Sequence, residues 1–225
     1  DDNNAEVCSD VDGDTCDDCS SGSFDTSNDG LDNDSDGICN DGDTSVDGDV
    51  ALSFENMTES SVDIGYISDM PIYGFQFSVS GVTLTGAESV PFDVSSGTNG
   101  VIAFSLTGAS LPTGTGTVAT LHFTPLLDGS TIGLTNIFIP GAAGASIVAH
   151  GPDDAVVPSC VSSDYSFDSD SDGHGHGGSS PFCDAIVADD WILDHDDNCP
   201  DTANPDQHNY DDDDDGDACD DDDDN

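Results

Sequence analysis

The chain has no lysine and no arginine among its 225 residues, whereas 49 residues are aspartate or glutamate. An unpaired charge is costly to remove from water, so buried charges in proteins normally have a partner of opposite sign. Six histidines are the only side chains here that can become cationic. The balancing positive charge must therefore come from bound metal ions or from a basic partner.

The acidic residues gather toward the two ends of the chain. Residues 1–49 contain 17 of them, residues 50–150 contain 7, and residues 151–225 contain 25. Alternate aspartates in an extended chain lie about 7 Å apart, which is inside the Debye length of roughly 10 Å at 0.1 M salt. Without cations, we expect both ends to expand and to lose order. We predict an acidic arm over 1–49, a β-sandwich over 50–152 and a second acidic arm over 153–225.

Several classes of function are disfavoured. No basic patch is present to bind nucleic acid, and no apolar run approaches the ~20 residues that cross a bilayer. The sequence lacks a nucleophile elbow, HExxH, a P-loop and GxGxxG. Acidic pairs are common, but without a predicted pocket they indicate metal binding rather than glycoside hydrolysis. We expect no enzymatic activity.

The aspartate spacing predicts calcium loops. The pattern D-x-D-x-D-G occurs at Asp32–Gly37 and again at Asp168–Gly173. Alternate carboxylates converge on one ion when the chain curls, and the glycine permits the sharp turn. Calcium accepts many oxygen ligands at flexible geometry, whereas magnesium requires a tight octahedron. The predicted ligands in these loops and in three shorter variants are Asp10, Asp12, Asp14, Asp32, Asp34, Asp36, Asp41, Asp43, Asp47, Asp49, Asp168, Asp170 and Asp172.

Solvated acidic linkers are the alternative interpretation of these runs. The loops are not EF-hands, because no helical periodicity flanks them and no glutamate occupies the twelfth loop position.

Eight cysteines occur only in the arms, which favours an oxidising, extracellular setting. Two pairs share a spacing of 20 residues, and we predict the disulfides Cys19–Cys39 and Cys199–Cys219. We also predict Cys8–Cys16 and Cys160–Cys183. Each 20-residue closure contributes about 3 kcal/mol in the chain-entropy model. Cys16 and Cys19 also form a C-x-x-C pair, so half of a zinc site is an alternative there.

The C-terminal arm resembles thrombospondin type 3 repeats. The matching residues are Asp194-His-Asp-Asp-Asn-Cys-Pro200, Asn204-Pro-Asp-Gln207, Asn209-x-Asp-x-Asp213 and Gly216-Asp-Ala-Cys-Asp220. Residues 8–43 match more loosely. Repeats of that family wrap around calcium ions, which implies that Asp168, Asp170, Asp172 and the 209–213 series are calcium ligands. The chain departs from the family by a long insertion between Gly173 and Asp194, and by Asp214 in place of glycine. The further predicted ligands in this arm are Asp194, Asp197, Asn209, Asp211, Asp213, Asp215 and Asp217.

Residues 50–150 predict an all-β fold, an antiparallel β-sandwich. Short apolar runs alternate with Gly, Pro, Asn and Thr at intervals of about ten residues. In the run 74–79, the side chains of Phe75, Phe77 and Val79 fall on one face. Asn99-Gly100 predicts a type I′ hairpin turn.

The sandwich resembles cohesin modules and related carbohydrate-binding modules. The residues that carry this likeness are Val50–Asn56, Ile72-Tyr-Gly-Phe-Gln-Phe77 and Gly116–Phe123. Cohesins bind dockerins, so the resemblance implies a dockerin-like or polysaccharide partner.

One apolar segment interrupts the C-terminal arm. We predict that Trp191, Ile192 and Leu193 either dock on the chain's own sandwich or anchor in a neighbouring subunit. Together these features predict a secreted protein loaded with several calcium ions, located outside the cell or on its surface, which self-associates into a filament or surface layer. An adhesin on a calcium-stiffened stalk is the alternative. Mineral nucleation by the aspartate runs after residue 210 is a third hypothesis.

Overall fold

The computed structural model describes residues 9–27, 29–32, 37–40, 42–43, 48–142, 146–211 and 213–221. Within these ranges there is no α-helix, and no helix with the length and apolar character that crossing a membrane requires. The chain divides into two compact units. The sandwich unit comprises residues 1–124 and 131–157, and the C-terminal unit comprises residues 125–130 and 158–225.

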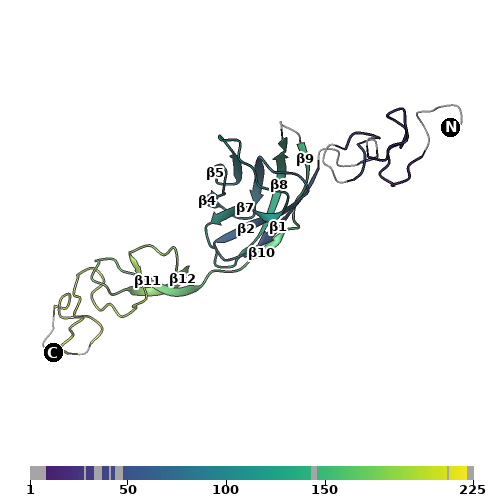
Figure 1. Ribbon diagram of the computed structural model, residues 1–225. Helices are drawn as coiled ribbons and strands as arrows, with labels where there is room; N and C mark the ends of the chain where they lie inside the picture. Colours follow the sequence, from purple (N-terminus) through teal and green to yellow (C-terminus); the bar gives the residue numbers. More distant parts are fainter. Residues whose placement is uncertain are drawn as a thin grey trace. The chain divides into compact units, whose positions relative to one another are not determined.

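Ten strands form the sandwich (Figure 1). They are β1 (Asp49–Glu55), β2 (Ser61–Ser68), β3 (Gly74–Ser80), β4 (Leu84–Glu88), β5 (Asp93–Gly97), β6 (Gly100–Phe104), β7 (Gly114–Phe123), β8 (Ser130–Pro140), β9 (Ser146–His150) and β10 (Ala155–Val157). The predicted all-β fold with a central β-sandwich is confirmed.

The alternation of apolar residues explains the core. In β3, Phe75, Phe77 and Val79 are buried on one face, as predicted, while Gln76 points outward and is exposed. Phe75 stacks on Phe77 with ring centroids 5.2 Å apart, and the ring of Phe92 meets Phe75 edge-on at 6.1 Å. Buried aliphatic side chains from β1, β2, β6, β7 and β8 complete one continuous cluster.

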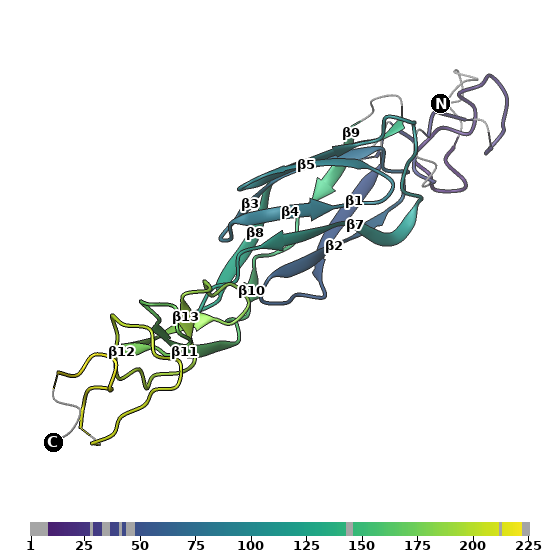
Figure 2. The same cartoon turned by 90° about the vertical axis from the view of Figure 1, so that its left-hand side faces the viewer.

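The strands follow one path, in the order β4-β7-β2-β1-β9-β8-β3-β6-β5, with β10 added beside β8. Figure 2 shows β4, β7 and β2 as neighbours, as the pairing requires. Strand β9 connects the two layers, because it pairs in parallel with β1 and antiparallel with β8. One pair therefore departs from the predicted antiparallel arrangement.

The hairpin between β5 and β6 differs by one residue from its prediction. Gly97 pairs with Gly100, which leaves Thr98 and Asn99 as the loop. Gly100 is thus the first residue of β6 rather than a turn residue. The predicted hairpin is confirmed, but its turn lies one residue earlier than Asn99-Gly100, at the position that the pairing of the two strands sets.

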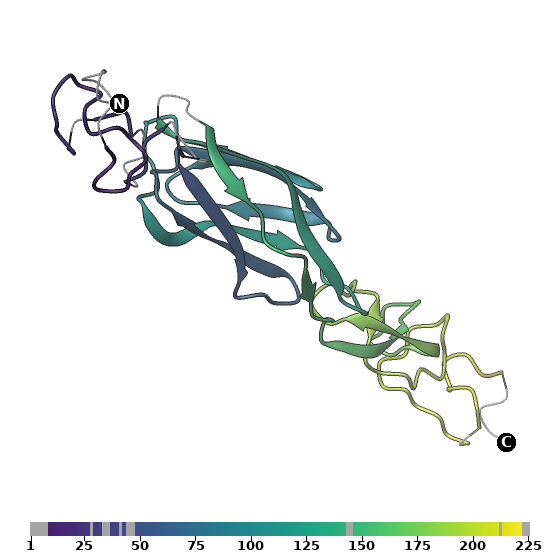
Figure 3. The same cartoon turned by 90° about the vertical axis from the view of Figure 1, so that its right-hand side faces the viewer.

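The C-terminal unit is more regular than predicted. It contains a three-stranded antiparallel sheet of β12 (His176–Cys183), β11 (Ser162–Phe167) and β13 (Trp191–Ile192) in that order, drawn in green in Figure 3. Trp191 packs against Phe167 and Phe182, with ring centroids 5.6 Å and 4.6 Å away. This aromatic cluster gives the unit a small apolar centre beside its acidic loops.

Candidate metal centres

The loop that follows β11 curls around the carboxylate of Asp168. Its Oδ1 accepts a hydrogen bond from the Ser171 amide at 2.7 Å, and its Oδ2 accepts one from the Gly173 amide at 3.0 Å. Gly173 has φ +97°, a conformation that favours glycine. The D-x-D-x-D-G pattern therefore folds as a tight turn with its carboxylates on the inside.

This turn gathers the three predicted ligands Asp168, Asp170 and Asp172. One oxygen from each carboxylate lies within 4.8 Å of the other two. Burial raises the pKa of Asp170, and the nearby carboxylates of Asp172, Asp197 and Asp168 raise it further. Oδ2 of Asp170 is buried and has no hydrogen-bond partner. These carboxylates repel one another, and a nearby side chain that can become cationic is a histidine, His174, which also contacts Asp194.

Asp197 brings a fourth carboxylate to the same region from later in the chain. Its Oδ1 accepts a hydrogen bond from the Cys199 amide at 2.8 Å, whereas its Oδ2 is buried without a partner. The amide of Asn204 donates to Oδ2 of Asp172 at 2.8 Å. Burial raises the pKa of Asp172, but this bond and others outweigh that effect, so the pKa is lowered overall. The turn and the 197–207 segment thus form one polar cluster, which we call the C-terminal centre.

The C-terminal centre fits a hard cation. Carboxylate oxygens are the ligands that calcium prefers, and calcium tolerates irregular geometry with six to eight oxygens. The buried oxygens of Asp170 and Asp197 have no hydrogen-bond donor. Burying such an oxygen is costly unless it is bonded, so both are free to bind a metal ion and would be stabilised by it. Nothing soft, such as a thiolate, contributes to the cluster.

Asp194, a predicted ligand, lies beside a histidine instead. Its Oδ2 is 3.3 Å from Nδ1 of His174, and its Oδ1 accepts a hydrogen bond from the Asp196 amide at 2.9 Å. The Asp196 amide is the largest cause of the lowered pKa of Asp194.

A second acidic group lies near the end of the chain. The carboxylates of Asp211, Asp213 and Asp220 offer oxygens within 4.8 Å of one another. Asn209 donates from Nδ2 to the Asp213 carbonyl at 2.8 Å, while its own Oδ1 is buried without a partner. Asp217 accepts a hydrogen bond from the Tyr210 amide at 2.7 Å and contacts Nδ1 of His208 at 2.6 Å. Asp215 and Asp217 lie outside this group, and Asp220, which we did not predict, belongs to it.

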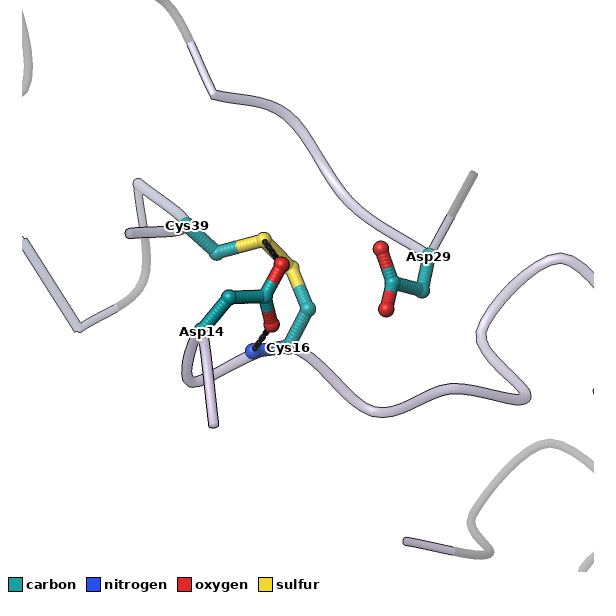
Figure 4. A group of neighbouring side chains, drawn as sticks. All are labelled: Asp14, Cys16, Asp29 and Cys39. Atoms are coloured by element: carbon teal, nitrogen blue, oxygen red, sulfur yellow. Dashed lines mark hydrogen bonds between the residues drawn. A yellow bond between two sulfur atoms is a disulfide. The ribbon is translucent and has the colours of Figure 1, made fainter. Parts of the chain in front are cut away.

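The N-terminal segment, residues 9–43, contains further groups. Asp10, Asp12 and Asp14 come together as predicted, within 4.8 Å. Asp14 also accepts a hydrogen bond from the Cys16 amide at 2.9 Å. Figure 4 shows Asp14 beside the Cys16–Cys39 disulfide, with the Asp29 carboxylate directed toward the same bond. Asp18 and Asp29, which join these groups, were not predicted, because neither belongs to a D-x-D series.

Other predicted ligands are not part of any group among the described residues. Asp32 accepts a hydrogen bond from the Gly37 amide at 3.1 Å. Asp49 begins β1 and lies 2.9 Å from Nε2 of His150. Asp43 is described but joins no group. Cys8, Asp34, Asp36, Asp41 and Asp47 lie outside the described residues.

The disulfides correct part of the prediction. Cys160–Cys183 and Cys199–Cys219 are confirmed. Cys39 pairs with Cys16 rather than Cys19, and Cys19 is also disulfide-bonded, so the predicted Cys19–Cys39 and Cys8–Cys16 pairs are wrong. Loops of 20 and 23 residues differ in closure entropy by only ~0.1 kcal/mol, so the repeated spacing could not decide between them. Because Cys16 and Cys19 are both oxidised, the zinc alternative fails.

The predicted interface residues are only partly covered. Trp191 and Ile192 are half-buried in β13, where the Trp191 ring is held by the aromatic cluster described above. Leu193 is 60% exposed. A role for these residues in self-association stays a prediction.

Comparison with known proteins gives no family assignment. No protein-family model matches the chain, and no curated protein matches it. Among solved structures it is similar to a type I cohesin in a cohesin–dockerin complex from Clostridium thermocellum, with 15% identity and a TM-score of 0.36 over 49% of this chain and 91% of the other. A cohesin module of a family 33 glycoside hydrolase from Clostridium perfringens shares 12% identity, with a TM-score of 0.36 over 49% of this chain and 94% of the other. A non-cellulosomal cohesin from the archaeon Archaeoglobus fulgidus shares 11% identity, with a TM-score of 0.35 over 50% and 91%. At these identities and TM-scores the matches carry no conclusion about function.

Proposed function

We propose that this chain is a secreted structural protein whose arms are rigidified by calcium, and that it assembles into an extracellular filament or surface layer. The observation that carries the proposal is the pair of buried, unpartnered oxygens on Asp170 and Asp197. They belong to a chain without lysine or arginine. A divalent cation supplies the partner that these two oxygens lack, and it adds positive charge to a group of four carboxylates that has only histidines such as His174 nearby.

In this proposal calcium stabilises the folded conformation of the arms and takes no part in a reaction. Extracellular calcium modules bind with Kd of about 0.1–1 mM. Calcium at about 100 times Kd stabilises a one-site fold by about 2.7 kcal/mol. Several such sites together offset the repulsion within each arm, and the disulfides limit how far the arms expand when calcium is absent.

An extracellular location follows from the same features. Disulfides persist in oxidising compartments and are rare in the reducing cytosol. Calcium loops of millimolar affinity are filled outside cells, where calcium is abundant. The proposal therefore places the chain outside the cell or on its surface.

The test is assembly of the full chain in calcium, in magnesium at the same ionic strength, and after chelation. We expect polymers in electron micrographs and in the sedimenting fraction with calcium only. The double variant Asp170→Asn/Asp172→Asn should need more calcium to assemble. Asp164→Asn, an exposed residue of β11, is the matched control and should behave as the unmodified chain. Assembly that survives thorough chelation, or no assembly in any condition, contradicts the proposal.

The outer face of one sandwich layer favours a second candidate function, binding of a partner by the sandwich. Gln76 is flanked in register by Ile102 and Phe138, which are 43% and 50% exposed. Phe104, two residues along β6 from Ile102, is 48% exposed. An apolar strip of this kind suits a protein or polysaccharide ligand, and a dockerin-like partner is one candidate, since one of the similar cohesins is described in a complex with a dockerin.

This alternative is tested with the double variant Ile102→Ser/Phe138→Ser in the full chain. Loss of binding to a glycan array or to calcium-loaded dockerins, with assembly unchanged, favours the adhesin function. Absence of any ligand for the unmodified chain argues against it.

A further inference from the structure

Asp18 is the most deeply buried charged residue among those described, with 0% of its surface exposed. Its Oδ2 accepts hydrogen bonds from the Ser9 hydroxyl at 2.7 Å and from the Val11 amide at 3.0 Å. Its Oδ1 is buried and accepts none. One oxygen therefore anchors the carboxylate to the chain while the other faces the interior without a partner.

Asp29, eleven positions later in the chain, is 5% exposed. Its main-chain carbonyl accepts a hydrogen bond from the Ser20 hydroxyl, which fixes the backbone, and its Oδ2 is buried without a partner. Oxygens of Asp12, Asp18 and Asp29 lie within 4.8 Å of one another. Three carboxylates thus come together, and two of them belong to nearly inaccessible side chains that each carry one unpartnered oxygen.

The surrounding sequence cannot neutralise this group. No lysine, arginine or histidine occurs before His122, so the segment has no basic side chain. Burial raises the pKa of Asp29, and the carboxylates of Asp14, Asp12 and Asp18 raise it further. An uncompensated group of buried carboxylates is costly. Only a bound cation or a proton removes that cost here.

We infer that Asp12, Asp18 and Asp29 form a calcium site with Asp18 and Asp29 as its buried floor, a site that the D-x-D spacing does not indicate. Asp12 also belongs to the group with Asp10 and Asp14, so the new site adjoins the predicted loop and shares a carboxylate with it. The sulfurs of Cys16 and Cys39 are joined to each other and do not ligate the ion. The inference rests on the proposed function, which assigns calcium to both arms, and it names a site in the N-terminal arm whose buried ligands lie outside the D-x-D series.

The site also explains how a short segment without an apolar core positions its disulfide. The Asp18 amide donates to the Ser9 carbonyl at 2.7 Å, and the Asp18 carbonyl accepts from the Asp25 amide at 2.8 Å. The Cys39 amide donates to the Asp14 carbonyl at 2.7 Å. Atoms of Asp29, Asp14, Cys16 and Cys39 also lie within 4.8 Å of one another, so Asp29 joins the new site to the disulfide.

The experiment counts calcium per full-length, oxidised chain by equilibrium dialysis and elemental analysis. Asp18→Asn and Asp29→Asn keep the size of each side chain but remove its charge, and each should lower the stoichiometry by one ion per chain. Asp25→Asn is the matched control, since this exposed carboxylate bonds only to Ser27 among the described contacts. Its calcium count should equal that of the unmodified chain.

A second measurement covers variants that fail to fold. In the unmodified chain, amide hydrogen exchange over residues 9–32 should slow on addition of calcium. The inference is overturned if exchange there is unchanged, or if the three variants and the unmodified chain bind equal numbers of calcium ions. A proton shared between the buried carboxylates then neutralises them instead. An equal loss in Asp25→Asn also overturns it, since the effect is then one of general charge. If the unmodified chain binds no calcium at all, the proposed function fails as well. If the unmodified chain binds calcium and neither Asp18→Asn nor Asp29→Asn changes the count, only this inference fails and the proposed function stands.

Discussion

The sandwich and the acidic segments are stabilised by opposite kinds of buried residue. The largest fully buried side chains of the sandwich are aromatic and aliphatic, with Phe75, Phe77 and Ile64 among them. In the acidic segments, residues 9–43 and 158–221, the largest fully buried side chains among the described residues are Asp18 and Cys199. Burial of apolar area stabilises the sandwich by itself, whereas burial of a carboxylate stabilises nothing until a cation or a donor arrives. One chain therefore combines a sandwich that is stable without cations with acidic segments whose stability depends on cations from the solvent.

The largest effect that separates the two regions should come from calcium removal. A chelator should leave the sandwich intact and expand the acidic segments, because each lost ion removes up to about 2.7 kcal/mol. Limited proteolysis with an aspartate-specific protease measures this directly, since cleavage should become rapid before residue 49 and after residue 158 only. Magnesium at equal concentration is the control. If the acidic segments are cleaved equally slowly with and without calcium, their stability does not depend on the ion and the two regions do not differ in this respect.

The second effect lies in the sandwich. Phe75→Ala should cost about 3–5 kcal/mol of unfolding free energy, because the side chain is 1% exposed and the cavity cannot be filled. Chemical denaturation measures the loss, and the calcium count should not change. Phe104→Ala, at an exposed position of β6, should cost far less. A fall in calcium binding by Phe75→Ala would mean that the two regions are not independent.

The third effect concerns the Cys199–Cys219 disulfide, which closes a 20-residue separation. Replacing both cysteines by serine should destabilise this part of the C-terminal unit by about 3 kcal/mol through the entropy of the unfolded chain. Hydrogen exchange of residues 197–220 should report the change, while the melting temperature of the sandwich should stay constant. If exchange there is unaffected in calcium, the ions alone hold the loops.

The smallest expected effect concerns Asp63 of the sandwich, whose carboxylate accepts hydrogen bonds from side chains of the same protein. The Thr120 hydroxyl donates to Oδ1 of Asp63 at 2.6 Å and, followed by the Asn56 amide, is the main cause of the lowered pKa of Asp63. A lowered pKa gives stability above the unfolded pKa, and this stability is lost as the pH falls through the folded pKa. Thr120→Val should therefore cost about 1 kcal/mol at pH 7, less at pH 3, and nothing should depend on calcium. A calcium-dependent cost would contradict the separation of the two regions.

The sequence predicted the sandwich well because periodicity reports directly on burial. The alternation of Phe75, Phe77 and Val79 placed β3, and the same rule located β1, β2 and β8. The turn at β5–β6 was misplaced by one residue, since pairing between strands rather than the Asn-Gly signal set the register. The sheet formed by β11, β12 and β13 was missed because β11 and β12 are mostly polar and β13 has only two residues.

The acidic loops were predictable only where the ligands are close in sequence. Asp168, Asp170 and Asp172 meet because a single turn brings them together. Asp18 and Asp29 are separated by ten residues without a repeating pattern, so their encounter depends on how the disulfides fold the segment. Cysteine spacing predicted Cys199–Cys219 correctly but failed in the N-terminal segment, where Cys16 rather than Cys19 proved to be the partner of Cys39.

Anomalous diffraction from crystals of the calcium-loaded protein tests the central claim most directly. We predict a calcium peak among the carboxylates of Asp168, Asp170 and Asp197, with the buried oxygens of Asp170 and Asp197 at 2.3–2.6 Å from the ion, the usual calcium–oxygen range. Ordered carboxylates at this place with no anomalous peak, and with only water or protons between them, would contradict the account.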